Sequence, residues 1–221
     1  VVGLDIDKNA IEIAKRNYKN NKKIKLINGN IEKLDMNIGI FDTILFYQSI
    51  YLVDVQKTIK TMKNLLNKNG QIVVMSINPE RSDFNPSKYA KKYHKIEELN
   101  SIFEKNGFSC SVYGSIHDDL INYRGKISTV IKILKLIASK MRIIPKGYKF
   151  KKILKRVFYG PLNTIPDDVR EIENIKYITP KKLENKNQYK DYICFYLLAE
   201  FKWLFNLLLN IYFLNSNKKN F

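Results

Sequence analysis

Short β-branched apolar runs alternate with amphipathic stretches of helical length through the first 113 residues of the chain. The apolar runs predict strands at Val1–Leu4, Ile24–Ile27, Phe41–Phe46, Gln71–Ile77 and Phe108–Tyr113. Parallel strands need long crossover connections, which helices supply. The alternation therefore predicts an α/β fold around a mostly parallel sheet.

The intervening stretches carry signals for the starts and ends of helices. Asp7 is placed as the N-cap of the first predicted helix. In the last one, Ile96, Leu99 and Phe103 share one face, and Asn106-Gly107 ends the helix. These signals agree with the strand positions on either side of them.

The helix before the strand Gln71–Ile77 is marked by apolar residues at spacings of three and four. We expect Asn69-Gly70 to supply its left-handed C-cap. The strand itself is apolar almost without interruption, which predicts a parallel strand covered on both faces. The apolar helix positions are Val55, Ile59, Met62 and Leu66.

After Tyr113 the alternation stops. Residues 119–190 contain a predicted basic apolar helix at 127–141 and several prolines, and we expect them to form an insertion or substrate cap. Residues 192–201 predict a strand that returns to the main sheet. The chain then divides into a core at 1–118, the insertion at 119–190, and a last strand with an apolar C-terminal helix at 191–221. That helix is too short to span a membrane.

Positive charge is concentrated in the second half of the chain. The formal net charge is +18, but residues 1–118 hold 18 basic and 13 acidic side chains. The stretch from Arg124 to Arg156 holds twelve Lys or Arg and no Asp or Glu. Three interpretations remain open: a solvated surface, peripheral contact with an anionic membrane or lipid-like acceptor, and nucleic-acid binding. Nucleic acid is less favoured, because residues 124–147 contain no aromatic side chain to stack on bases.

Several polar residues directly follow predicted strands, where parallel α/β sheets bind their ligands. They are Asp5, Asn30, Tyr47, Gln48 and Asn78. Asp5 is the candidate for ribose binding, since a carboxylate accepts hydrogen bonds from both hydroxyls of a ribose. The alternative role, a carboxylate at the start of a helix, is already filled by Asp7.

Other site chemistries lack the residues they need. The segment Asp5–Asn9 opens like a calcium loop, but Ala10 and Arg16 stand where glycine and a bidentate glutamate are required. His94 and His117 have no further ligand at zinc spacing, so we expect no metal site. His117 follows a strand and remains a candidate general base. No nucleophile elbow or phosphate-binding lysine loop is present.

The two cysteines lie far apart in predicted buried strands. Cys110 and Cys194 are therefore expected to be inert, reduced thiols. No signal-peptide pattern opens the chain. These features predict a cytoplasmic protein, with possible peripheral contact at the membrane.

Five segments of the chain carry a further pattern: 1–7, 27–34, 41–46, 65–74 and 103–108. In this order they resemble class I S-adenosylmethionine-dependent methyltransferases. The similarity covers about residues 1–113 and the strand at 192–201, which resembles the family's antiparallel last strand, and it implies a Rossmann-like fold.

The resemblance implies a cofactor, S-adenosylmethionine, and a set of residues that bind it. By this resemblance Asp5 binds the ribose and Ile6 packs against the adenine. Asn30 and Ile31 lie at the adenine edge, with Asn30 where the family commonly has aspartate. Tyr47 corresponds to the residue that lines the methionine end of the cofactor.

The sequence departs from the family pattern at its start. The family's first strand and its Gly-x-Gly-x-Gly loop have no counterpart here, so we expect a fragment of a longer chain. The sheet is then expected to have a gap between the family's second and fourth strands. We expect the fragment alone to be inactive, with low stability and negligible cofactor binding.

The resemblance implies direct methyl transfer to an acceptor, for which we expect a small molecule, a lipid-like compound or a glycan precursor. Tyr47, Gln48, Tyr51 and His117 are the acceptor-side candidates, and the loop Asn78–Glu80 is expected to frame the same pocket. No catalytic base is identified. Two alternatives remain: an NAD-dependent Rossmann oxidoreductase, and a non-enzymatic basic module that binds membrane or RNA.

Overall fold

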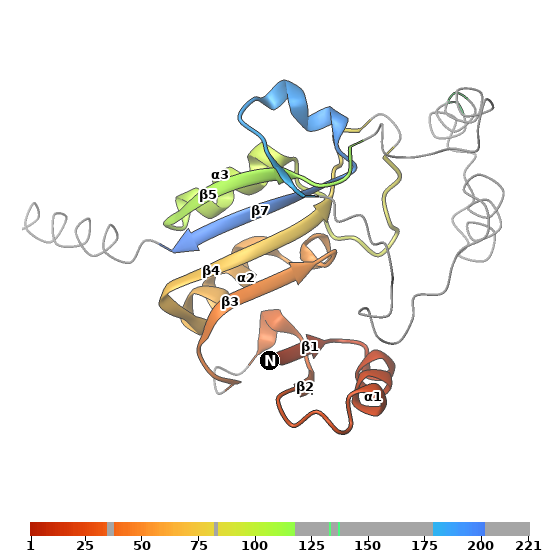
Figure 1. Ribbon diagram of the computed structural model, residues 1–221, viewed down its shortest axis with the longest axis vertical. Helices are drawn as coiled ribbons and strands as arrows, with labels where there is room; N and C mark the ends of the chain where they lie inside the picture. Colours follow the sequence, from red (N-terminus) through yellow and green to blue (C-terminus); the bar gives the residue numbers. More distant parts are fainter. Residues whose placement is uncertain (35–37, 82–83, 118–132, 134–136, 138–178, 202–221) are drawn as a thin grey trace, which may run out of the picture.

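The computed structural model describes residues 1–34, 38–81, 84–117, 133, 137 and 179–201. Strands and helices alternate through the first half of the chain, as predicted (Figure 1). The expected helices at 127–141 and 203–214 lie outside the described residues, apart from positions 133 and 137. The elements are β1 Val2–Asp5, α1 Lys8–Asn17, β2 Lys25–Asn28, η1 Ile31–Lys33, β3 Phe41–Tyr47, η3 Ile50–Leu52, α2 Val55–Leu65, β4 Leu66–Ile77, α3 Ile96–Lys105, β5 Phe108–Gly114, β6 Lys181–Lys182, η7 Lys186–Asp191 and β7 Cys194–Phe201.

The strands form two sheets. The small sheet pairs β1 with β2 in parallel, and the large sheet has the order β3-β4-β7-β5-β6. No pairing joins β1 to β3, so the arrangement is interrupted between them (Figure 1). The interruption lies where the resemblance predicted a gap in the sheet.

Strand β7 lies between β4 and β5 and runs antiparallel to both. Its register pairs Val74 with Leu197 on one side and Val112 with Leu197 on the other. The predicted return of residues 192–201 to the main sheet is therefore confirmed. Lys181 and Lys182 also join the sheet, as the short edge strand β6 beside β5.

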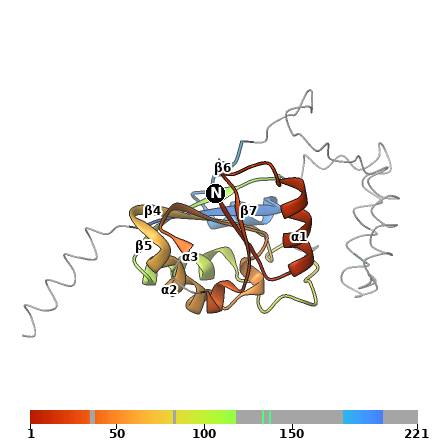
Figure 2. The ribbon, with the colours of Figure 1, turned by 90° about the horizontal axis from the view of Figure 1, so that it is seen from below.

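The core lies between the large sheet and the two helices α2 and α3, which cover the same face of it (Figure 2). Ile59 and Met62 of α2 and Phe103 of α3 are fully buried there. They pack in one cluster with Ile72 and Leu197 of the sheet. The apolar spacing predicted from the sequence therefore marks the buried faces of both helices.

The opposite face of the large sheet is open along β3. On β3, Leu45 is 60% exposed and Tyr47 is 65% exposed, and on β4 Val73 is only half-buried. The expectation of cover on both faces concerned the strand Gln71–Ile77, where no residue is exposed and Met75, on this same face, is 6% exposed, so it is not contradicted. β3 is open on this face because α2 and α3 share the other one, whereas α1 packs beside the small sheet (Figure 1).

The predicted C-cap of α2 is wrong. The helix ends at Leu65, and Leu66, in extended conformation, already begins β4 and pairs with Phe41. Gly70 does not have a positive φ angle, unlike Gly107 after α3. A Cβ atom at Gly70 would lie 2.8 Å from Leu66 Cδ2 and 3.0 Å from the Asn67 carbonyl oxygen. Glycine is thus needed there for close packing.

Candidate active site

The carboxyl end of the small sheet is held together by the side chain of Asn28. Its Nδ2 donates hydrogen bonds to the carbonyl oxygens of Asp5 and Ile6, each at 3.0 Å. The backbone N–H of Gly29 donates to the Asp5 carbonyl as well, also at 3.0 Å. The end of β2 therefore fixes the turn that follows β1.

Asp5 and Ile6 project from this turn toward solvent. Asp5 Oδ1 accepts a hydrogen bond from the Asp7 N–H at 2.8 Å, which orients the exposed carboxylate. Asp7 caps α1, as predicted, by accepting from the N–H groups of Asn9 and Ala10. Asp5 is thus not needed as a helix cap, and Ile6 beside it is 71% exposed. An ordered carboxylate and an exposed apolar side chain are adjacent here.

Asn30 and Ile31 follow β2 at the same edge. Asn30 Oδ1 accepts from the Glu32 N–H at 2.9 Å and so caps η1. The Asn30 side-chain amide retains its N–H donors, which have no acceptor among the described residues. Ile31 is half-buried and packs against the core under the large sheet. Of the two, Asn30 is therefore the residue with a group available to a ligand.

Tyr47 and Gln48 lie at the carboxyl end of β3. Gln48 has a φ of 54°, a left-handed conformation that costs a non-glycine residue free energy. Its backbone N–H donates to the Met75 carbonyl at 2.9 Å. Its side-chain Nε2 lies 3.7 Å from Cys194 Sγ, so the side chain reaches past β4 to β7. Gln48 Oε1 is buried without a hydrogen-bond partner among the described residues.

Tyr51 forms part of an aromatic cluster beyond β3. Its ring stacks on Tyr93 with centroids 4.5 Å apart, and Phe84 packs edge-on against Tyr93 at 4.7 Å. The Tyr51 carbonyl accepts from the N–H groups of Lys91 and Lys92, which attaches the loop before α3 to η3. Burial, with a smaller contribution from Tyr93, raises the pKa of Tyr51. Tyr51 is therefore a neutral phenol at neutral pH.

His117 lies beside the start of β7. It forms an isolated antiparallel bridge with Tyr192, and the two rings meet edge-to-face with centroids 5.1 Å apart. Because β7 is antiparallel, its start lies at the edge where β4 and β5 end. His117, which follows β5, and Gln48, which follows β3, thus lie at the same edge of the large sheet. Strands β4 and β7 lie between β3 and β5.

Asn78 directly follows β4, as predicted, and its side chain has a structural role there. Its buried side chain donates from Nδ2 to the carbonyls of Tyr189, at 2.6 Å, and Tyr192, at 3.0 Å. Its Oδ1 accepts from the Glu80 N–H at 3.0 Å. The amide is used in holding the chain before β7, so it is not free to meet a ligand.

Glu32 is a residue of this region that the sequence analysis did not single out. Its Oε1 accepts from the Asp54 N–H and from Lys91 Nζ, each at 2.6 Å. Its side chain is 15% exposed. Lys91 and the Asp54 N–H hold the pKa of Glu32 below its ordinary value. The only feature of the sequence that could have pointed to Glu32 is its place as an acidic residue in the first turn after the cap Asn30.

The cysteines have no sign of reactivity. Burial raises the pKa of Cys110 to about 12 and also raises that of Cys194, so both stay thiols at neutral pH. Within the described ranges, no group of three His, Cys, Asp or Glu side chains is placed to hold a metal ion.

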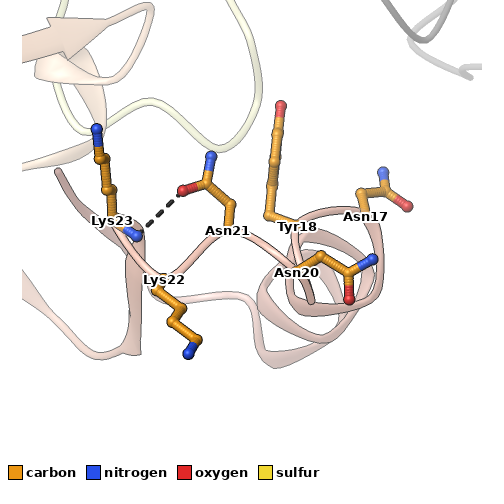
Figure 3. Close-up of a pocket in the computed structure, with 6 residues that line it drawn as sticks. All are labelled: Asn17, Tyr18, Asn20, Asn21, Lys22 and Lys23. Atoms are coloured by element: carbon orange, nitrogen blue, oxygen red, sulfur yellow. Dashed lines mark hydrogen bonds between the residues drawn. The ribbon is translucent and has the colours of Figure 1, made fainter.

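One surface pocket of about 600 Å³ lies at the turn between α1 and β2 (Figure 3). Figure 3 shows its polar side chains, with the Lys23 N–H donating to Asn21 Oδ1 at 3.0 Å. The turn precedes β2, whereas Asp5 and Asn30 follow β1 and β2. The pocket therefore lies at the opposite edge of the small sheet and is not the candidate site. It is lined by Asn17, Tyr18, Asn20, Asn21, Lys22 and Lys23.

These features define a Rossmann-like nucleotide-binding fold with an antiparallel strand inserted before the end of the sheet. A family model described as "Methyltransferase domain" matches residues 1–156. The chain therefore belongs to this methyltransferase family, is a class I S-adenosylmethionine-dependent enzyme and uses S-adenosylmethionine as its cofactor. A search of curated proteins found no match.

A solved structure supports the same fold. The chain is similar to a S-adenosylmethionine-dependent methyltransferase from Thermotoga maritima, a possible histamine N-methyltransferase, with 15% identity and a TM-score of 0.50 over 91% of this chain and 72% of the other. It is also similar to a methyltransferase from Archaeoglobus fulgidus, with 14% identity and a TM-score of 0.48 over 90% and 75% of the two chains.

The residues present are compatible with the adenosine part of the cofactor. Asp5 offers a carboxylate for the ribose, Ile6 an apolar surface for the adenine, and Asn30 an N–H donor for the adenine edge. For the methionine part, the printed sequence has no glycine-rich loop. Gln48 Oε1, at the carboxyl end of β3, is one of four buried polar side-chain atoms without a hydrogen-bond partner among the described residues.

Proposed function

We propose that this enzyme methylates a small-molecule, lipid-like or glycan-precursor acceptor, and that the acceptor binds over the carboxyl end of β3. The adjacent pair Asp5 and Ile6 carries the cofactor half of the proposal. Both side chains are exposed at the carboxyl end of β1, and Asn28 fixes the backbone beneath them. The NAD-dependent alternative is not supported, since β7 runs antiparallel to β4 and β5, like the last strand of the methyltransferase family.

On the cofactor side, the residues bind and orient. The Asp5 carboxylate accepts hydrogen bonds from the ribose hydroxyls, and Ile6 covers one face of the adenine. Asn30 uses its Oδ1 as a helix cap, which leaves Nδ2 to donate to a ring nitrogen of adenine. An aspartate in its place has no such donor. The asparagine therefore favours contact with an unprotonated ring nitrogen.

On the acceptor side, Tyr47, Gln48, Tyr51 and His117 form the walls. S-adenosylmethionine supplies an activated methyl group on a sulfonium, so positioning of the acceptor accounts for much of the rate. The buried Gln48 Oε1 is a hydrogen-bond acceptor suited to an O–H or N–H of the substrate. Tyr51, with its raised pKa, contributes a neutral ring and hydroxyl rather than a base.

The basic stretch from Arg124 to Arg156 belongs to the same proposal. It lies outside the described residues except for positions 133 and 137, and its twelve Lys and Arg favour an anionic acceptor or an anionic membrane surface. None of the described helices is long and apolar enough to cross a bilayer. A cytoplasmic location with peripheral membrane contact remains a prediction.

Calorimetry of S-adenosylhomocysteine binding to the full-length protein tests the cofactor half. Asp5→Asn keeps Oδ1 for the Asp7 N–H but removes the charge, so we expect affinity to fall about 10- to 100-fold. Asp7→Asn is the matched control. It removes a carboxylate two residues away while keeping the helix cap, and affinity is expected to change less than about twofold. Absence of binding by the wild type, or equal affinity of the wild type and Asp5→Asn, overturns the proposal.

A further inference from the structure

Among the described residues, Glu32 makes two short polar contacts between the segment after the small sheet and the part of the chain that belongs to the large sheet. No strand pairing connects β1 with β3. Glu32 lies in η1, directly after the small sheet, and its Oε1 is shared by two groups that belong to the large sheet's side. One is the Asp54 N–H at the start of α2 and the other is Lys91 Nζ in the loop before α3, each at 2.6 Å.

The contacts of Glu32 with Asn30 and with Lys91 connect it to two different parts of the candidate active site. Asn30, two residues earlier, accepts from the Glu32 N–H and carries the donor assigned to adenine. Lys91 donates its backbone N–H to the Tyr51 carbonyl, and Tyr51 stacks on Tyr93 in the same loop. A single carboxylate therefore connects the adenine edge with the aromatic cluster on the acceptor side.

We propose that Glu32 is a positioning residue, which fixes Asn30 against the adenine and couples cofactor binding to the order of the loop that carries Tyr93. The inference rests on the proposed function, because it assigns Asn30 to the adenine edge. Glu32 does not touch the reacting atoms. It acts through Asn30 on one side and through Lys91 on the other.

The charges around Glu32 decide which substitutions are informative. The facing groups are the Lys91 ammonium, the Asp54 N–H and the Asp54 carboxylate. Glu32→Gln keeps an oxygen for the Asp54 N–H and removes the charge that attracts Lys91. Lys91→Met removes the ammonium and keeps most of the aliphatic stem. Lys92→Met is the matched control, because Lys92 pairs with Glu98 rather than Glu32.

The experiment compares two ligands on the full-length protein by calorimetry. S-adenosylhomocysteine has an unprotonated N1, which accepts from Asn30, whereas S-inosylhomocysteine carries a proton there. We expect the wild type to prefer the first ligand by about tenfold or more. Glu32→Gln and Lys91→Met are each expected to weaken its binding about five- to tenfold and to reduce the preference to about twofold. The double variant is expected to be no weaker than the weaker single, because the pair acts as a unit.

The ligand preference separates a positioning role from a merely structural one. A loss of stability weakens both ligands by the same factor and leaves the preference unchanged, and that result overturns the inference. Unchanged binding in Glu32→Gln also overturns it, while the proposed function stands. If the wild type binds neither ligand, the proposed function fails and the inference fails with it. Lys92→Met is expected to match the wild type with both ligands.

Discussion

The large and small sheets are built from the same kind of strand–helix unit, but they bury their side chains to different degrees. In the large sheet, Ile72, Val74 and Leu197 are completely buried beneath α2 and α3. In β1, α1 and β2, the buried side chain is Ile11, and the strand residues are half-buried or exposed. Two four-residue strands with one helix do not enclose a core of their own.

This difference places the proposed cofactor residues on the less buried part of the molecule. Asp5, Ile6 and Asn30 all belong to the small sheet or follow it directly. Its attachment to the large sheet includes the packing of Ile31 and the hydrogen bonds of Glu32. Binding residues on a weakly enclosed unit depend on such contacts for their position. The stability of the protein and the geometry of the cofactor site are thus determined by different regions.

The largest expected contrast comes from removing one leucine from each sheet. Leu197→Ala leaves a cavity in the main core and is expected to lower the free energy of unfolding by about 2–5 kcal/mol. Leu26→Ala, in half-buried β2, is expected to lower it by about 1 kcal/mol. Urea denaturation followed by circular dichroism measures both. Equal losses would contradict the assignment of the core to the large sheet.

Replacing one glycine in each sheet by alanine gives a second, smaller difference in stability. A Cβ atom at Gly114 in β5 would overlap the ring of Tyr192, which is buried. Gly114→Ala is therefore expected to cost about 1–3 kcal/mol through overpacking. At Gly3 in β1, the added Cβ lies 2.8 Å from Leu26 Cδ2, the end of a flexible side chain that can rotate. Gly3→Ala is expected to cost less than about 1 kcal/mol.

Thermal unfolding of the two alanine variants checks this prediction. The melting temperature of Gly114→Ala should fall by several degrees, and that of Gly3→Ala should stay near the wild type. A larger fall for Gly3→Ala would show that β1 and β2 pack more rigidly than their exposure indicates.

Local sequence patterns predicted helices correctly where the apolar spacing matches the buried face and where a capping residue starts the helix. Ile59 and Met62 recur at helical spacing, and both are fully buried. Asp7 was placed as a cap from its position alone, and it accepts two backbone N–H groups. Residues 192–201 predict a strand from their own apolar pattern, whereas the antiparallel orientation of β7 was expected from the family resemblance.

The features that the sequence did not reveal depend on contacts distant in sequence. Asn69-Gly70 has the composition of a C-cap, but pairing of Leu66 with Phe41 ends α2 earlier. Asn78 follows a strand, as ligand-binding residues do, yet its amide is satisfied by carbonyls more than 100 residues later. Glu32 was not singled out because its partners, Asp54 and Lys91, are not close to it in sequence.

The smallest expected effect comes from removing one helix cap in each region. The comparison of the two variants separates local from global unfolding. Asp54 Oδ1 accepts from the Lys57 N–H at the start of α2, and Asp7 Oδ1 accepts from the Asn9 N–H at the start of α1. Loss of either cap costs about 1 kcal/mol. Because α2 packs in the main core, Asp54→Ala is expected to lower the free energy of global unfolding by that amount.

Asp7→Ala is expected to act locally instead, since α1 belongs to the weakly enclosed unit. Its cost should appear as about fivefold faster hydrogen exchange of the Ile11 and Ala14 amides, with an unchanged urea midpoint. In Asp54→Ala the midpoint should shift, and exchange in α1 should stay near the wild type. Equal shifts of the midpoint in both variants would mean that the small sheet unfolds together with the large one, despite the missing strand pairing between β1 and β3.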